Sequence, residues 1–303
     1  MMPKQAMAST EETTKTAPLA LRLLRSGLRA AGAVSPALAG RLAYDWLWFR
    51  TTRFPEHPRH TDVLERAEQT VVPYDDTSVT VYSWGRGPTV LLVHGWNGRC
   101  AQMAPFVDPL LDADFRVLGV DLPAHGRSSG TRTDIFEIVG ALERLAEKEG
   151  PLRAAIAHSF GTLALLTALQ NGIQTDRAVC INPAVHLDVL VDKFSSTLHL
   201  PDAVAADLYD RVAAFVGEGF YREFSMPSGT PGLVIHDRDD EDIPWREGKA
   251  IADAWSGAHF VRTDGRGHRR ILRDTAVIER AVDFVRALTD GSSTSPRRSH
   301  ESL

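Results

Sequence analysis

The pentapeptide Ala157-His158-Ser159-Phe160-Gly161 decides the fold, because it joins an apolar strand to a helix through a serine. The strand before it is Leu152–Ile156, and the apolar run after it begins at Thr162. A serine held in a sharp strand-to-helix turn exposes its hydroxyl, and its neighbours must be small because the backbones crowd together. Gly161 meets that need, and the amino terminus of the helix directs free N–H groups at the same place. The competing interpretation of Ser159 is an ordinary helix cap.

Strands and helices alternate on both sides of this turn from residue 67 onward. Continuous apolar runs such as Thr89–Val93 are typical of strands buried on both faces of a mostly parallel sheet. The turn sequence Asp75-Asp76-Thr77 predicts an antiparallel hairpin at the edge of that sheet. We expect strands at 68–73, 78–84, 89–94, 116–120, 153–158, 178–182, 232–236 and 258–263, and helices at 101–112, 134–148, 161–171, 246–255 and 270–288.

One long segment, residues 184–230, interrupts this alternation. It is too long for a simple connection, and its helical pattern is too regular for a loop, so it predicts a small lid over the carboxyl ends of the strands. The expected fold class is therefore α/β: a doubly wound, mostly parallel eight-stranded sheet with helices on both faces and a small helical lid. The expected division is a flexible tail at 1–17, a basic helical arm at 18–60, an α/β core at 61–183 and 231–289, the lid at 184–230 and a flexible tail at 290–303.

The charge of the 303-residue chain is uneven. The net charge is −5, which argues against a nucleic-acid partner, although the first sixty residues hold nine basic and four acidic side chains. In the arm, Leu21, Leu24 and Leu28 share one helical face, and a second apolar stripe is Leu38, Leu42, Trp46 and Phe49. We favour a helix packed on the α/β domain with its arginines in solvent. Contact of residues 18–52 with a membrane surface is the alternative.

The cysteine and histidine content and the apolar runs limit which disulfides, metal sites and locations are expected. Cys100 and Cys180 cannot form a disulfide framework in a chain of this size, and both are expected to be buried thiols. No cysteine or histidine spacing indicates a metal site, and no cofactor is expected. A secretory signal and a long uncharged apolar run are both absent from the sequence, so the expected location is the cytoplasm.

Residues 67–288 resemble the α/β-hydrolase family. The pentapeptide is similar to the family's nucleophile elbow, Gly-x-Ser-x-Gly, with Ala157 in place of the first glycine. His94-Gly95-Trp96 closes a predicted strand, and the resemblance implies an oxyanion hole formed by the backbone N–H groups of Trp96 and Phe160. Asp121–Ser128 is similar to the family's Asp-x-Pro-x-His-Gly-x-Ser turn, and we expect His94 and His125 to have structural roles.

The resemblance also implies the two partners of the serine. The run from His236 to Pro244 looks like the family's acid loop, in which the acid precedes x-x-Val/Ile-Pro, and this pattern selects Asp240. Asp239 is the nearest rival and Asp188 a more remote one; a divalent-cation loop is a further interpretation of so acidic a run. His268 follows Gly265-Arg266-Gly267 after the last predicted strand, which completes the order Ser, Asp, His.

The resemblance implies a serine hydrolase that cleaves a carboxylic ester or thioester through an acyl-enzyme, with Ser159, His268 and Asp240 as catalytic triad. An amidase, a peptidase or an acyltransferase would use the same groups, and a non-catalytic binding protein on this fold is the alternative of another class. Ser159 argues against epoxide or halide chemistry, which uses a carboxylate at the elbow. An apolar small-molecule acyl substrate is favoured by the lid side chains Phe194, Leu198, Leu200, Phe215, Phe220, Tyr221 and Phe224, unless they form the lid's own core.

Overall fold

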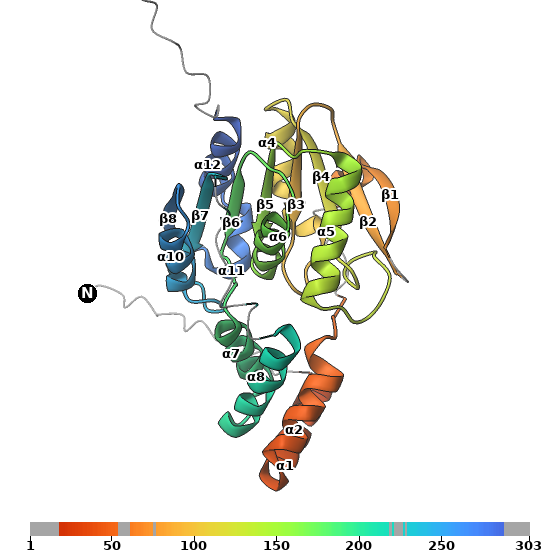
Figure 1. The fold of residues 1–303 in the computed structure, drawn as a ribbon, viewed down its shortest axis with the longest axis vertical. Helices are drawn as coiled ribbons and strands as arrows, with labels where there is room; N and C mark the ends of the chain where they lie inside the picture. Colours follow the sequence, from red (N-terminus) through yellow and green to blue (C-terminus); the bar gives the residue numbers. More distant parts are fainter. Residues whose placement is uncertain are drawn as a thin grey trace, which may run out of the picture.

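An eight-stranded sheet forms the middle layer of the protein (Figure 1). The computed structural model describes residues 18–53, 61–74, 77–217 and 229–287, together with Phe220 and Pro227. The predicted tails and the turn residues Asp75 and Asp76 lie outside the described residues. In the order in which they lie across the sheet, the strands are β1 (Glu68–Tyr74), β2 (Thr77–Trp84), β4 (Arg116–Asp121), β3 (Thr89–Val93), β5 (Ala154–His158), β6 (Ala178–Ile181), β7 (Gly232–Asp237) and β8 (Ala258–Thr263).

The pairing of the strands follows from their sequence patterns. β1 pairs antiparallel with β2, and β2 with β4, whereas all other neighbouring strands are parallel. Every residue of the apolar strands β3, β5 and β6 is buried, while most of the polar strand β1 at the edge is exposed. The expected fold class, the edge hairpin and the strand positions are thus confirmed to within a residue or two.

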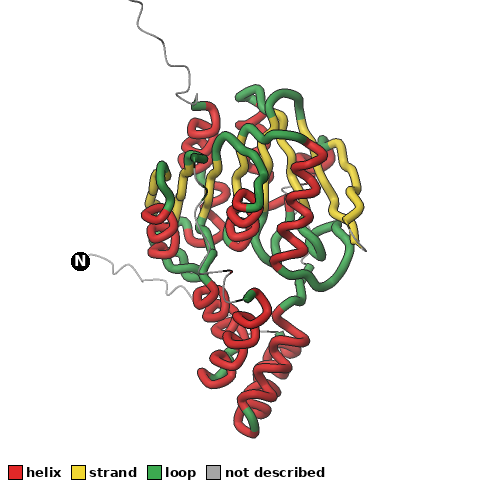
Figure 2. Tube along the Cα trace, in the orientation of Figure 1, coloured by secondary structure: helices red, strands yellow, loops and turns green. Residues whose placement is uncertain are grey.

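Helices cover both faces of the sheet (Figures 1 and 2). The helices α5 (Ile135–Glu149), α6 (Phe160–Gln170) and α10 (Trp245–Ala254) bury their apolar stripes against one face. The other face is covered by α3 (Thr61–Glu65), η3 (Cys100–Phe106), α4 (Val107–Leu111), η4 (Ile271–Arg273) and α12 (Thr275–Arg286). Cys100 and Cys180 are both buried as free thiols in these two cores.

Two predicted helices are interrupted. The helix expected at 101–112 is a 3-10 helix, η3, followed by the single α-helical turn of α4. Pro105 and Pro109 lie within this stretch, and a proline has no N–H for the i to i−4 hydrogen bond. The helix expected at 270–288 is divided as well: α11 (Gly267–Arg270) is followed by η4, which ends at Arg273. The carboxylate of Asp274 then accepts the N–H of Val277 and caps the start of α12.

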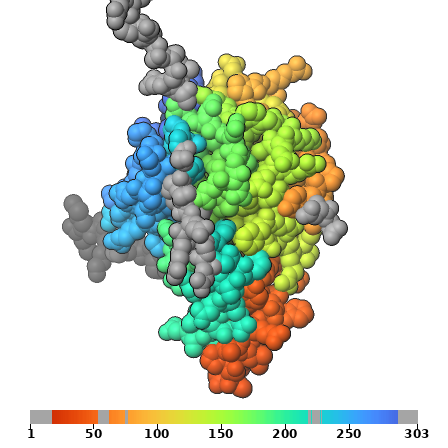
Figure 3. Space-filling model, in the orientation of Figure 1, coloured from red at the N-terminus to blue at the C-terminus, as the bar shows by residue number. Residues whose placement is uncertain are grey.

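Helices from two separate parts of the described chain form a projection beyond the carboxyl ends of the strands (Figures 1 and 3). From the predicted lid come α7 (Leu187–Leu198) and α8 (Asp202–Val216). From the predicted arm come α1 (Leu19–Val34), α2 (Pro36–Ala43) and the π-helical turn η1 (Tyr44–Trp48). They share a small core of their own, formed by Ala43, Leu187, Val191, Leu208 and Val212.

Helices α1 and α2 of the arm pack on α7 and α8, whereas residues 49–53 bond to loops of the α/β domain. The expected packing on the α/β domain therefore holds only for the end of the arm. The buried side of α2 consists of Ala39, Gly40 and Ala43, and these small residues let the helix approach α8 closely. Of the predicted stripe, Leu38, Leu42 and Trp46 therefore lie on the opposite, exposed side, whereas Phe49 is partly buried and packs against Phe215. Within the described part of the chain, no helix is long and apolar enough to cross a membrane.

Candidate active site

The turn between β5 and α6 forces Ser159 into a strained conformation. Its φ of 54° and ψ of −129° lie outside the regions that L residues favour. Two glycines make room for this turn. A side chain at Gly95 would begin only 2.8 Å from Cβ of Ser159, and one at Gly161 would collide with the carbonyl oxygen of His94. The strand-to-helix geometry therefore presents the hydroxyl of Ser159 at the end of the sheet.

The side chains of Ser159, His268 and Asp240 form a continuous hydrogen-bonded relay. Nε2 of His268 lies 2.9 Å from Oγ of Ser159, and Nδ1 of His268 lies 2.7 Å from Oδ2 of Asp240. The other oxygen of Asp240, Oδ1, accepts the backbone N–H groups of Asp242 at 2.8 Å and Ile243 at 2.9 Å. The hydroxyl, the imidazole and the carboxylate come from three separate segments of the chain and form one chain of hydrogen bonds.

The carboxylate of Asp240 is buried but stays ionised. Burial alone would raise its pKa, but the hydrogen bonds from His236 and His268, the positive charge that His268 can carry and the N–H of Ile243 outweigh burial. Together they hold the pKa of Asp240 well below its ordinary value. A carboxylate of this kind stabilises an imidazolium beside it and fixes the tautomer with a lone pair on Nε2.

The two other candidates for the acid, Asp239 and Asp188, form hydrogen bonds with other groups and not with His268. Asp239 accepts the N–H of Gly265 at 2.8 Å and faces solvent. Asp188 lies in the first turn of α7, where its Oδ1 accepts the N–H of Val189. Asp242 lies two residues after Asp240. It is half-buried and forms an ion pair with Lys193 of the lid.

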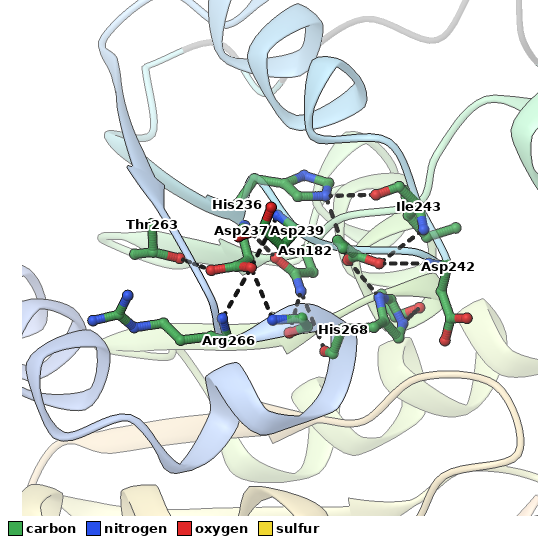
Figure 4. A network of polar contacts seen from close by, with 12 residues as sticks. Asn182, His236, Asp237, Asp239, Asp242, Ile243, Thr263, Arg266 and His268 are labelled. Atoms are coloured by element: carbon green, nitrogen blue, oxygen red, sulfur yellow. Dashed lines mark hydrogen bonds and ion pairs between the residues drawn. The ribbon is translucent and has the colours of Figure 1, made fainter. Parts of the chain in front are cut away.

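Asp237, which the sequence patterns did not single out, anchors the segment that carries His268 (Figure 4). This fully buried carboxylate ends β7, and its Oδ1 accepts the N–H groups of Arg266 at 3.1 Å and Gly267 at 2.8 Å. Its Oδ2 accepts the hydroxyl of Thr263 at 2.7 Å. Hydrogen bonds from these N–H groups and the hydroxyl lower the pKa of Asp237 against the opposing effect of burial. The one feature of the sequence that could have indicated Asp237 is its place as an acidic residue at the end of an apolar strand.

Two further side chains that we did not predict hold the backbone of His268. Nε2 of His158 lies 2.8 Å from the carbonyl oxygen of His268, and Nδ2 of Asn182 lies 3.2 Å from the same oxygen. Oδ1 of Asn182 also accepts the N–H of Asp237 at 2.9 Å. Burial and the neighbouring His268 lower the pKa of His158 to about 3, so it is neutral and donates to this carbonyl.

The loop after β3 lies across from Ser159. The rings of Trp96 and Phe160 meet edge to face with centroids 5.2 Å apart, and both residues line the same cavity as Ser159. Phe160 is the first residue of α6, and the first four N–H groups of a helix have no acceptor within the helix. The two predicted oxyanion-hole residues are thus brought together beside the serine.

Two buried histidines hold these loops in place. Nε2 of His94 accepts the N–H of Leu122 at 3.1 Å, and Nε2 of His125 accepts the N–H of Asn97 at 3.0 Å. Burial lowers the pKa of His94 to about 4 and that of His125 to about 3, so both rings are neutral. Both interactions are structural, as their sequence context had suggested.

A cavity of about 820 Å³ opens beside Ser159 and is lined mainly by apolar side chains. Its walls come from the core, the lid helices and the arm. The lid side chains Phe194, Leu198 and Phe215 line the cavity, whereas Leu200 packs in the core of the projection. Phe220 packs against the main core, and Tyr221 and Phe224 lie outside the described residues. The apolar lid residues are therefore divided between the cavity and the lid's own packing.

Comparison with known proteins identifies the family. The profile described as "Alpha/beta hydrolase family" matches residues 90–286, which include Ser159, Asp240 and His268. The chain belongs to this family.

Curated relatives of this chain match over short segments. A pimeloyl-[acyl-carrier protein] methyl ester esterase of Vibrio atlanticus is 44% identical over 80 residues, which cover 26% of this chain and 30% of the relative. The dihydrolipoyllysine-residue acetyltransferase component of an acetoin cleaving system of Cupriavidus necator is 36% identical over 81 residues, which cover 25% and 21% of the two chains. The chain thus spans less than a third of the length of these relatives.

Solved structures share the fold at low identity. A bromoperoxidase from Bacillus anthracis superposes with a TM-score of 0.57 at 16% identity, covering 72% of this chain and 99% of the other. Est1E from Butyrivibrio proteoclasticus, solved with ferulic acid bound, has the same TM-score and identity and covers 72% and 96%. At this identity the likeness concerns the fold.

The chain departs from the family elbow at Ala157. Its backbone is part of β5 and pairs in register with Val93 and Cys180. An extended backbone accepts any L residue, so a glycine is not required here for conformation. Within this turn the positive φ is at Ser159 and not at Ala157.

Proposed function

We propose that this chain is a serine hydrolase that cleaves a carboxylic ester or thioester through an acyl-enzyme intermediate. In this proposal Ser159 is the nucleophile, His268 the general base and Asp240 the residue that orients His268. The observation that carries it is the relay from Ser159 through His268 to Asp240, with distances of 2.9 Å and 2.7 Å, at the wall of an apolar cavity.

The proton path follows from the relay. His268 takes the hydroxyl proton of Ser159 on Nε2 as Oγ attacks the acyl carbonyl, and the Asp240 carboxylate stabilises the resulting imidazolium. His268 then gives this proton to the leaving alcohol or thiol. In the second half-reaction a water molecule gives a proton to His268 as it attacks the acyl carbonyl. His268 then returns this proton to Oγ of Ser159 as the bond between Oγ and the acyl carbon breaks and the acid leaves.

The oxyanion is assigned to two backbone donors. The N–H groups of Trp96 and Phe160 lie on the two segments that meet beside Ser159, and the amino terminus of α6 adds its dipole. Loss of one such donor costs about 10²–10³ in rate in well-studied hydrolases. No step of this mechanism requires a metal or an organic cofactor.

The comparisons support an ester as substrate. Among the relatives, the pimeloyl-[acyl-carrier protein] methyl ester esterases are named for ester cleavage, although each covers only part of this chain. We therefore place esters and thioesters before amides, and we propose that the lid segment and the arm cover the site.

Initial rates with acetyl esters, acetyl thioesters and acetyl anilides of the same aryl group test the proposal. We expect the wild type to hydrolyse the ester and the thioester faster than the anilide. Ser159→Ala should lower kcat by at least about 10³-fold while the thermal unfolding midpoint stays close to that of the wild type. Hydrolysis by Ser159→Ala at the wild-type rate would assign any activity to another group and reject the triad.

A further inference from the structure

The arm closes one side of the cavity beside Ser159. It lies outside residues 90–286, the segment that matches the family profile. Apolar side chains from α1, from η1 and from the residue after η1 line the cavity, namely Leu21, Leu24, Leu47, Trp48 and Phe49. One wall of the cavity therefore comes from a segment outside the residues that match the family profile.

The wall interlocks with the lid helices. Trp48 meets Phe194 of α7, and Phe49 meets Phe215 at the end of α8, each pair edge to face with ring centroids 5.0 Å apart. All four rings line the cavity. Ring contacts of this geometry stabilise the arrangement beyond the area that they bury.

Three contacts away from the rings fix the arm in position. The guanidinium of Arg25 donates to the carbonyl oxygen of Thr197 at 2.7 and 3.1 Å. Gly40 lies so close to Asp207 of α8 that a side chain at this position would collide with the carboxylate. The N–H of Thr52 donates to Oδ1 of Asn97 at 2.7 Å, which ties the arm to the loop beside Trp96.

The charged residues of the cavity leave its apolar lining intact. Lys193 and Asp242 form an ion pair with each other. Asp134 is the N-cap of α5, with its Oδ1 2.8 Å from the N–H of Phe136. Arg50 and Arg269 also line the cavity, and both are exposed to solvent. A ligand in the interior therefore meets mainly hydrocarbon and aromatic rings.

We propose that the arm forms one wall of an acyl-chain tunnel and that the substrates are esters or thioesters of medium- and long-chain fatty acids. The chain would run from Ser159 between the arm and the lid helices. The proposal rests on the hydrolase activity proposed above. Cavities of about 300–1,000 Å³ bind ligands of this size, and each buried methylene contributes about a fourfold gain in binding.

Chain-length profiles of three arm variants test this inference. We would measure kcat/KM for p-nitrophenyl acetate, butyrate, octanoate, dodecanoate and hexadecanoate. Leu24→Trp fills the tunnel and Leu24→Ala widens it. Leu23→Trp is the matched control, because Leu23 is 64% exposed on the same helix and faces away from the cavity.

In the wild type, kcat/KM should rise with chain length until the tunnel is filled. Leu24→Trp should lower the ratio of the dodecanoate to the acetate value by on the order of tenfold or more, which corresponds to two or more displaced methylenes. Leu24→Ala should move the optimum to longer chains, and Leu23→Trp should keep the wild-type profile. An unchanged ratio in both Leu24 variants would overturn the proposal.

A binding measurement separates this inference from the proposed function. Fluorescent dodecanoate is titrated into wild-type protein and into both tryptophan variants, so that turnover plays no part. Weaker binding by on the order of tenfold in Leu24→Trp alone supports the tunnel, and equal binding in all three proteins rejects it. If the wild type hydrolyses no ester, the proposed function fails and the titration alone decides the inference.

Discussion

Asp240 is the residue on which the relay depends most, because its two oxygens serve different partners. Oδ2 forms a hydrogen bond with Nδ1 of His268, while Oδ1 accepts the backbone N–H groups of Asp242 and Ile243. An amide at this position would keep the size of the side chain and lose the negative charge that orients and stabilises the imidazolium. We therefore expect Asp240→Asn to lower kcat by about 10⁴-fold with little change in KM.

Asp239→Asn is the matched control for this prediction. It removes the same charge one residue away, from a carboxylate that accepts the N–H of Gly265 and does not contact His268. Its kcat should stay within about tenfold of the wild type, because only the loop contact is weakened. Equal losses of kcat in the two variants would contradict the assignment of Asp240.

The sequence allowed this site to be predicted only in part. The motif spacing selected Asp240 over Asp239, because the acid is defined by its distance from Ile243-Pro244. Asp237 was missed because its partners are backbone N–H groups of residues 266 and 267, which leave no side-chain pattern. His158 was missed as a positioning residue because the carbonyl that it holds is 110 positions away.

At the scale of elements, the root of the lid segment depends on a buried carboxylate. Glu247 of α10 accepts the N–H groups of Val185 and His186 at 2.9 and 2.8 Å, and its other oxygen lies 2.8 Å from Nδ1 of His186. The hydrogen bond to Glu247 raises the pKa of His186 above its ordinary value. The hydrogen bonds from His186 and Val185 lower the pKa of Glu247 against the effect of burial.

This pair predicts how the stability of the fold depends on pH. A histidine whose pKa is raised on folding adds stability below its unfolded pKa of about 6.5, and this is lost as the pH rises through the folded value. Glu247 contributes above about pH 4.5, so the protonated pair acts between these limits. His186→Asn should lower the thermal unfolding midpoint by about 1–3 °C more at about pH 5.5 than at about pH 9, since His186 is half-exposed and partly screened.

The control for His186→Asn is His199→Asn. His199 follows α7 with φ of 53°, a conformation that asparagine tolerates well. Calorimetry at both pH values should show the same change for this variant. A larger loss for His186→Asn at the higher pH would contradict the predicted charge state of the pair.

The hydrophobic pattern of the arm did not indicate which face of α2 packs against its neighbours. A stripe of Leu38, Leu42 and Trp46 satisfies helical periodicity, yet the face that packs is formed by Ala39, Gly40 and Ala43. Close helix contact favours small residues, and a hydrophobicity pattern gives them little weight. Contact of residues 18–52 with a membrane surface was the alternative to packing, and it stays a prediction.

At the scale of the whole molecule, the order of strands and helices could be predicted because each leaves a local pattern. Buried strands such as β3 and β5 are continuous apolar runs, and turn residues separate them. The cavity could not be predicted in the same way. Its walls join residues near position 21 to residues near positions 95, 194 and 268, and no local pattern connects these segments.

Covalent labelling of the intact protein tests the central claim most directly. A fluorophosphonate reacts with an activated serine, so the wild type should gain the mass of one adduct, located by peptide mapping on Ser159. Ser159→Ala should gain none, and Asp240→Asn should react more slowly than Asp239→Asn. Absence of an adduct on folded wild-type protein, or equal labelling of wild type and Ser159→Ala, would contradict the account.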